Sequence, residues 1–153
     1  MERALEPVKI LLVEDNPYDV EITVKALKKG RIKNELVVAR DGQQALDMLF
    51  GNGSGEKRLP GLVLLDLNLP KVNGLEVLKQ LKADPDLRRI PVIVLTASTH
   101  EEDIVRSYDL GVNTFISKPV EFEEFIKVLS LIEQYWMFIA TLPPRSRTEE
   151  AAA

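Results

Sequence analysis

The sequence predicts an α/β domain in which five parallel strands form one doubly wound sheet, covered by helices on both faces in three α/β/α layers. Short runs rich in Val, Leu and Ile alternate five times with segments of helical periodicity. Such alternation implies parallel strands joined by right-handed crossovers. The length of 153 residues also suits one domain with a complete hydrophobic core.

Three expected strands are almost wholly apolar, which is typical of strands covered on both faces. They are Val8–Val13, Leu62–Asp66 and Pro91–Thr96. Glu35–Arg40 and Thr114–Ser117 are weaker strands, so we expect them nearer the edges of the sheet.

The expected helices have recognisable ends. Asn16 and Pro17 offer a cap and a first-turn proline, and Gly30 is expected to end this first helix. Helices are also expected over Gly42–Phe50 and Gly74–Ala83. A fourth should follow Thr99, whose spacing from Glu102 matches a capping box, and should end at Gly111.

The last expected helix, from Val120 onward, carries two apolar stripes, although one stripe is enough to cover a sheet. We therefore expect Tyr135, Trp136 and Phe138 to contribute to an interface. The alternative is an extra helical turn that folds back onto the same core.

The composition excludes several classes of site. Without cysteine and with one histidine, the chain has no thiol nucleophile or disulfide framework and cannot build a zinc or copper cage from histidine. Its net charge of −4, with both signs interspersed, argues against nucleic-acid binding. The longest uncharged stretches have eleven residues, too few to span a membrane.

The chain ends suggest location and domain extent. The amino terminus carries charges where a signal peptide has its apolar segment, so we expect a cytoplasmic protein. The domain is expected over residues 1–142, with its core at about 8–142, and residues 143–153 are expected to form a flexible tail. The glycine-rich segment Gly51–Leu59 is expected to be a surface loop, and we assign it no function.

Reactive side chains stand at the carboxyl ends of four expected strands. Glu14 and Asp15 end the first, Asp66 the third and Thr96 the fourth, while Lys118 follows the fifth. In an open parallel sheet these ends converge on one crevice, where ligands bind. Three carboxylates at one rim repel one another, so a divalent cation would stabilise them.

The residue types predict the chemistry of this crevice. Oxygen ligands without histidine favour Mg²⁺, or Mn²⁺ in its place. Asp66 could then act as a nucleophile that forms an aspartyl phosphate. Thr96 and Lys118 would stabilise the phosphoryl oxygens by a hydrogen bond and a positive charge.

Each of these residues also has an ordinary structural explanation. Glu14 and Asp15 could favour the positive end of the following helix, Asp66 could cap a turn, and Lys118 could be solvated. Their joint occurrence at successive strand ends favours a functional site. His100 stands among polar residues at an expected helix start, and we expect it at the surface.

Four segments, ILLVEDNP, LVLLDLNLPKVNG, PVIVLTAS and GVNTFISKP, resemble the signature segments of the receiver domain of two-component response regulators, in the same order. The resemblance extends from about Val8 to Leu142. The aromatic carboxyl-terminal part, with Tyr135 and Trp136, is similar to single-domain regulators paired with bacterial and cyanobacterial phytochromes.

The resemblance implies a flavodoxin-like (βα)5 fold with strand order 2-1-3-4-5. Asp66 would accept a phosphoryl group from the histidine of a sensor kinase, such as a phytochrome kinase, and the domain would catalyse only its own phosphorylation and dephosphorylation. Mg²⁺ would be held by Asp15, by Glu14 largely through water, by Asp66, and by the backbone carbonyl of Asn68.

The resemblance also implies a switch. Thr96 would move toward the phosphoryl group while Phe115 turns inward, and Pro119 would follow a cis peptide bond. The fourth and fifth helices with the fifth strand would then pass the signal to a protein partner or a homodimer. Phe115 lacks the hydroxyl of the tyrosine common in the family, so a switch that needs that hydroxyl is not available. Asn68 and Ser98 would influence hydrolysis of the phosphoryl group.

Three other functions compete with this hypothesis. A phosphatase with an aspartyl nucleophile usually has a second aspartate two residues later, where this chain has Asn68. A flavin-binding electron carrier needs a first loop that accepts phosphate, whereas Glu14 and Asp15 repel an anion. A receiver that works without phosphorylation would not need the complete site.

Overall fold

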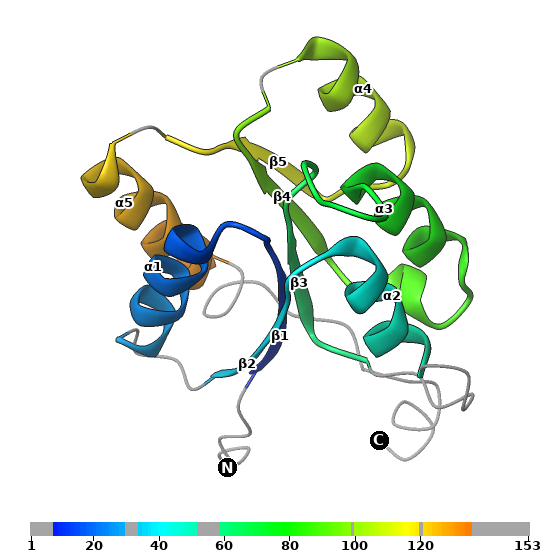
Figure 1. Cartoon of the computed structure of the whole chain (residues 1–153), viewed down its shortest axis with the longest axis horizontal. Helices are drawn as coiled ribbons and strands as arrows, with labels where there is room; N and C mark the ends of the chain where they lie inside the picture. Colours follow the sequence, from blue (N-terminus) through cyan, green and yellow to red (C-terminus); the bar gives the residue numbers. More distant parts are fainter. Residues whose placement is uncertain (1–7, 30–33, 52–58, 99, 120, 136–153) are drawn as a thin grey trace.

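The computed structural model describes residues 8–29, 34–51, 59–98, 100–119 and 121–135. A five-stranded sheet lies between two layers of helices (Figure 1). All strand pairs are parallel, and the strand order is β2-β1-β3-β4-β5, which confirms the predicted fold. The strands are β1 (Val8–Val13), β2 (Asn34–Ala39), β3 (Leu62–Leu65), β4 (Val92–Thr96) and β5 (Thr114–Ser117).

The helices divide between the two faces of the sheet. Helices α1 and α5 cover one face, and α2, α3 and α4 lie on the other (Figure 1). Their bounds are α1 (Pro17–Lys28), α2 (Gly42–Phe50), α3 (Gly74–Ala83), α4 (Glu101–Asp109) and α5 (Phe122–Ile132), with a short 3₁₀ helix η1 (Leu87–Arg89) before β4.

The apolar strands serve both layers because successive side chains of a strand point to opposite faces. In β1, Leu11 and Val13 pack with the side chains of α2 and α3, whereas Ile10 and Leu12 pack with those of α1 and α5. The same alternation occurs in β3 and β4. Two-sided burial explains why these strands are continuous apolar runs in the sequence.

The predicted helix starts are confirmed in part. Asn16 caps α1, since its Oδ1 accepts hydrogen bonds from the Tyr18 and Asp19 N–H groups. Thr99 lies outside the described residues, and exposed His100 occupies the N-cap position of α4 without a side-chain cap. The expected capping box therefore has no test here, while the expected surface position of His100 is confirmed.

Helix α4 is less firmly anchored than the other helices. Its one fully buried side chain is Ser107, whose hydroxyl has no hydrogen-bond partner. Val105 and Tyr108 on the same helix are 54% and 51% exposed. A helix that buries so little apolar surface has low local stability.

The last helix shows the two expected stripes only in part. Phe125, Leu129 and Ile132 face the core, while Leu131 and Tyr135 are exposed. The chain widens into a π-type turn over residues 133–135. Trp136, Phe138 and the expected tail lie outside the described residues, as does most of the Gly51–Leu59 loop. Within the described part, no helix has the length and apolar character needed to cross a bilayer.

Candidate functional site

The sheet brings the predicted residues to one edge, because each ends or follows a strand at its carboxyl end. Backbone hydrogen bonds continue the sheet into the site: Glu14 N–H donates to Ala39 O, Asp66 N–H to Val13 O, and Lys118 N–H to Thr96 O, at 3.0, 3.0 and 2.7 Å. These bonds hold the start of each loop in register with the neighbouring strand.

Three acidic residues, which we call the acid cluster, gather at this edge. Glu14, Asp15 and Asp66 each contribute a carboxylate oxygen, and these oxygens lie within 4.8 Å of one another. Glu14 and Asp66 are buried, whereas Asp15 is exposed. Two carboxylates of the acid cluster are therefore buried, and the third lies at the solvent side.

Lys118 neutralises the buried part of the acid cluster. Its ammonium donates to Glu14 Oε1, to Asp66 Oδ2 at 3.1 Å and to Asp19 Oδ2 at 2.9 Å. The Lys118 side chain is only 9% exposed. An ammonium group has three N–H donors, so each donor has a carboxylate partner.

Thr96 and the loop after β3 orient Asp66. The Thr96 hydroxyl is fully buried and donates to Asp66 Oδ1 at 2.6 Å, and Asn68 N–H donates to the same oxygen at 3.1 Å. Asp66 Oδ2 faces Lys118. The carboxylate is thus held by donors on both oxygens, a geometry that favours its ionised form.

The environment separates the proton affinities of the two buried acids. Burial is the largest influence on Glu14 and raises its pKa to about 7, with the charge of Asp66 adding to the rise and Lys118 opposing it. Burial also raises the pKa of Asp66, but the hydrogen bond from Thr96 and the charge of Lys118 outweigh it, so this pKa lies below its usual range. Asp66 is therefore the carboxylate available as a nucleophile near neutral pH.

The contacts of Lys118 keep it charged. Burial alone lowers the pKa of the Lys118 ammonium, but its hydrogen bond to Glu14 and the charges of Glu14 and Asp66 raise the pKa above the usual value. A permanent positive charge beside Asp66 can stabilise an anionic group that approaches it.

The acid cluster also fits a divalent cation. The atoms that it offers as metal ligands are carboxylate oxygens, without nitrogen or sulfur. Hard cations such as Mg²⁺ and Mn²⁺ prefer such ligands. One ligand sits at the solvent side, where an ion can enter. The predicted contribution of the Asn68 carbonyl has no test here and stays a prediction.

One expected feature of the site is wrong. Among the described residues, which include Lys118 and Pro119, there is no cis peptide bond, so the bond before Pro119 is trans. A trans X–Pro bond is favoured by about 0.5–1 kcal/mol in the absence of other constraints. In this arrangement the Lys118 ammonium already has three carboxylate partners.

The predicted switch residues Thr96 and Phe115 are connected to α4 by hydrogen bonds. Thr96 Oγ1 accepts a hydrogen bond from Ser98 N–H at 3.3 Å, and the Ser98 hydroxyl donates to Asp103 Oδ2 in the first turn of α4 at 2.6 Å. Phe115 is half-buried against the core beneath α2 and α3. Its N–H donates to the Tyr108 hydroxyl at 3.3 Å.

Sequence reasoning did not identify Asp19, Asp103 or Gly74 as contributors. Asp19 lies in the first turn of α1, at the same edge as the acid cluster, and this position was a usable signal. At Gly74 an added Cβ would lie 2.3 Å from the Asp66 carbonyl oxygen, so glycine lets α3 approach the site. Asp103 had no comparable signal, because its pairing with Ser98 depends on how the loop before α4 folds.

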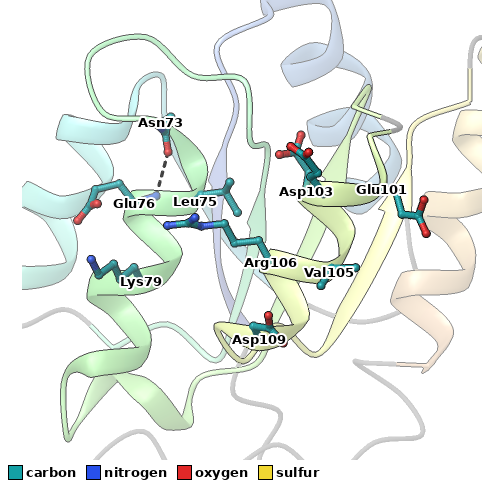
Figure 2. Close-up of a pocket in the computed structure, with 10 residues that line it drawn as sticks. Asn73, Leu75, Glu76, Lys79, Glu101, Asp103, Val105, Arg106 and Asp109 are labelled. Carbon is teal, nitrogen blue, oxygen red and sulfur yellow. Dashed lines mark hydrogen bonds between the residues drawn. The ribbon is translucent and has the colours of Figure 1, made fainter.

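A separate groove of about 760 Å³ lies between α3 and α4. Figure 2 shows Glu76 and Lys79 on one side and Asp103, Arg106 and Asp109 on the other. The groove contains no residue of the acid cluster. Its lining is mostly charged, unlike the apolar pockets that hold small-molecule cofactors.

Comparisons with known proteins agree with this arrangement. Residues 10–130 match the family model of the response regulator receiver domain. The chain is 44% identical over 138 residues to response regulator Rcp1 of Synechocystis sp., covering 90% of this chain and 94% of that protein. Two crystal structures, each 44% identical, are similar in fold. The Mn²⁺-bound form of Rcp1 has a TM-score of 0.86 over 90% of this chain and 100% of that chain. The phosphorylated cyanobacterial phytochrome response regulator RcpA has 0.87 over 91% and 100%.

Proposed function

This chain belongs to the response regulator receiver domain family, and on that premise we propose that it accepts a phosphoryl group on Asp66 from a sensor histidine kinase. The observation that carries the proposal is the setting of Asp66. Its carboxylate is buried between the Thr96 hydroxyl and the Lys118 ammonium, next to two further acids. No step of the transfer needs a thiol or an imidazole from this chain, or an aspartate two residues after Asp66 as a general acid.

In the proposed transfer, one carboxylate oxygen of Asp66 forms a bond to phosphorus. The bond between phosphorus and the kinase histidine nitrogen breaks, and its electron pair stays on that nitrogen. Asp66 attacks without first losing a proton, since its pKa lies below the usual range. In the later hydrolysis a water molecule takes the phosphoryl group, inorganic phosphate leaves and the free Asp66 carboxylate returns.

The neighbouring residues stabilise the incoming charge. Lys118 would exchange part of its carboxylate contacts for phosphoryl oxygens, and the Thr96 hydroxyl would turn from Asp66 to the same group. Asp15, Glu14, Asp66 and the Asn68 carbonyl would hold Mg²⁺, which supplies positive charge that offsets repulsion between the acids and the phosphoryl oxygens. The Mn²⁺ in the Rcp1 structure supports a divalent cation here.

The signal would leave through the α4–β5–α5 face. If Thr96 turns toward a phosphoryl group, the Ser98 N–H loses its acceptor, and the loop that leads to Asp103 and α4 is free to rearrange. The weak anchoring of α4 makes two arrangements close in energy, so a phosphoryl group can shift their populations. Similarity to a phytochrome response regulator favours a phytochrome-type kinase as the phosphoryl donor.

A homodimer through the same face is the form of output that we propose. Val105 and Tyr108 on α4, with Leu131 and Tyr135 on or after α5, are large side chains more than half exposed, and such apolar surface favours association. Val105→Glu should lower the dimer fraction in sedimentation experiments. Val37→Glu is the matched control, because Val37 is also exposed but lies on edge strand β2. Equal sedimentation of both variants, or a monomeric phosphorylated protein, would contradict the dimer.

The phosphoacceptor itself is tested by intact-mass spectrometry after incubation with acetyl phosphate and Mg²⁺. We expect one added phosphoryl group, which disappears with Asp66→Asn and remains with Asp47→Asn, a change at a half-buried α2 residue that does not belong to the acid cluster. Absence of the adduct in the unmodified protein, or its persistence in Asp66→Asn, would refute the proposal. Turnover of an aryl phosphate over many cycles would indicate a phosphatase instead.

A further inference from the structure

Asp19 holds a position that the proposed chemistry leaves unexplained. Its carboxylate is the third partner of the Lys118 ammonium, at 2.9 Å, but it is not among the oxygens of the acid cluster. The other two partners of Lys118, Glu14 and Asp66, do belong to that cluster. A cation that enters the acid cluster therefore competes with Lys118 for two of its partners and leaves Asp19 free.

The structure fixes Asp19 firmly. Asn16 caps the helix by accepting the Asp19 N–H at 3.1 Å, and the Asp19 carbonyl oxygen accepts the hydroxyl of buried Thr23 at 2.7 Å. The first turn of a helix also favours a negatively charged side chain. The Asp19 side chain is 20% exposed, so it sits behind Lys118 rather than in open solvent.

Lys118 needs such an anchor once a divalent ion is present. A lysine ammonium is a compact charge on a flexible four-carbon chain, and a doubly charged ion among its partners repels it. The incoming phosphoryl group requires both positive charges at the same time. An acceptor outside the metal ligands can keep the ammonium beside Asp66 while the ion occupies the acid cluster.

We propose that Asp19 is a positioning residue that holds Lys118 beside Asp66 when a divalent cation occupies the acid cluster. The inference rests on the function proposed above, in which Lys118 stabilises the phosphoryl oxygens. The role of Asp19 becomes decisive only in the ion-bound protein, because without the ion Glu14 and Asp66 bind Lys118 together with Asp19.

Protection of Lys118 from a lysine reagent measures this role directly. The full chain is treated briefly with acetic anhydride with and without saturating Mg²⁺, and acetylation of Lys118 is quantified by peptide mass spectrometry against exposed Lys79. We expect Lys118 to stay protected in the unmodified protein under both conditions. In Asp19→Asn, Mg²⁺ should raise its acetylation several-fold, whereas Asp19→Glu, which keeps the charge, should protect it better. Glu21→Gln, on the same helix in an exposed pair with Lys25, is the control.

Phosphorylation by acetyl phosphate is the second readout. Asp19→Asn should slow adduct formation at saturating Mg²⁺ by about tenfold, less than the roughly 10²–10³-fold typical of removing a stabilising donor itself. Glu21→Gln should leave the rate unchanged. Thermal unfolding of each variant checks that the fold is kept.

The outcomes separate this inference from the proposed function. Equal protection of Lys118 in Asp19→Asn and the unmodified protein with Mg²⁺ would overturn it. Loss of protection that is the same with and without Mg²⁺ would also overturn it, since that result indicates a merely structural role. If the unmodified protein accepts no phosphoryl group, the proposed function fails, while the acetylation experiment still decides what Asp19 does.

Discussion

Replacing Lys118 with methionine tests how the buried acids are balanced. Methionine keeps most of the apolar stem, which matters because the side chain is almost fully buried. The substitution removes the contacts to Glu14, Asp19 and Asp66. It leaves two buried carboxylates, Glu14 and Asp66, without their cation, so the folded state should become less stable.

The distances set the size of the effect. At an effective dielectric constant of about 20, an ion pair near 3 Å contributes about 5 kcal/mol of attraction before the cost of burial is subtracted. Removing one partner of a buried pair destabilises proteins by about 3–5 kcal/mol. Near neutral pH, protonation of Glu14 relieves part of this loss, because burial already raises its pKa to about 7.

We therefore expect Lys118→Met to lower the free energy of unfolding by about 3 kcal/mol near neutral pH. A carboxyl whose pKa is raised in the folded state makes the protein less stable as pH rises. Above neutral pH, each further pH unit should therefore increase the loss of unfolding free energy by up to about 1.4 kcal/mol, until the Glu14 pKa of the variant is reached. Mg²⁺ should stabilise the variant more than the unmodified protein, since the ion no longer competes with an ammonium.

Urea unfolding followed by circular dichroism, with and without Mg²⁺, measures both effects. Lys25→Met is the matched control, because Lys25 forms an exposed pair with Glu21 at 3.0 Å and such pairs contribute only about 0.3–0.5 kcal/mol. Equal losses of unfolding free energy in Lys118→Met and Lys25→Met would refute the stabilising role of the buried Lys118 charge. A Mg²⁺ effect no larger in Lys118→Met than in the unmodified protein would refute the competition between ion and ammonium.

Three further predictions concern positions around the site. Ser107→Ala removes a buried hydroxyl without a hydrogen-bond partner, so urea unfolding should show a gain of about 1 kcal/mol; a loss would mean that the hydroxyl is paired. Gly74→Ala places a Cβ 2.3 Å from the Asp66 carbonyl oxygen, so stability should fall by about 1–3 kcal/mol and labelling by acetyl phosphate should slow. Gly111→Ala, where the nearest neighbouring atom is 3.5 Å away but φ is +102°, should also lower stability yet leave labelling unchanged, and equal labelling of both variants would contradict the close approach. Because Glu14 has a pKa of about 7 and a metal ligand must be deprotonated, calorimetry should show Mg²⁺ affinity rising between about pH 6 and pH 8 and then levelling off; an affinity that does not change with pH would contradict the raised pKa.

The fold class and the edge that carries the site follow from the sequence by itself. Apolar runs such as Leu62–Leu65, alternating with capped helices, leave few arrangements other than a parallel sheet with two helical layers. The same rule places whatever follows each strand at one edge, which is why Glu14, Asp66 and Lys118 could be grouped before any distance was known. These inferences need only periodicity and chain order.

Only the tertiary structure decided which atoms meet. The pairing of Lys118 with Asp19, the link from Ser98 to Asp103 and the trans bond before Pro119 each depend on loop paths and side-chain rotamers. Residues that are distant in the chain reach bonding distance through the summed geometry of several elements. Sequence periodicity specifies which face a side chain occupies but not its distance from a partner, and the electrostatics of this site change steeply with that distance.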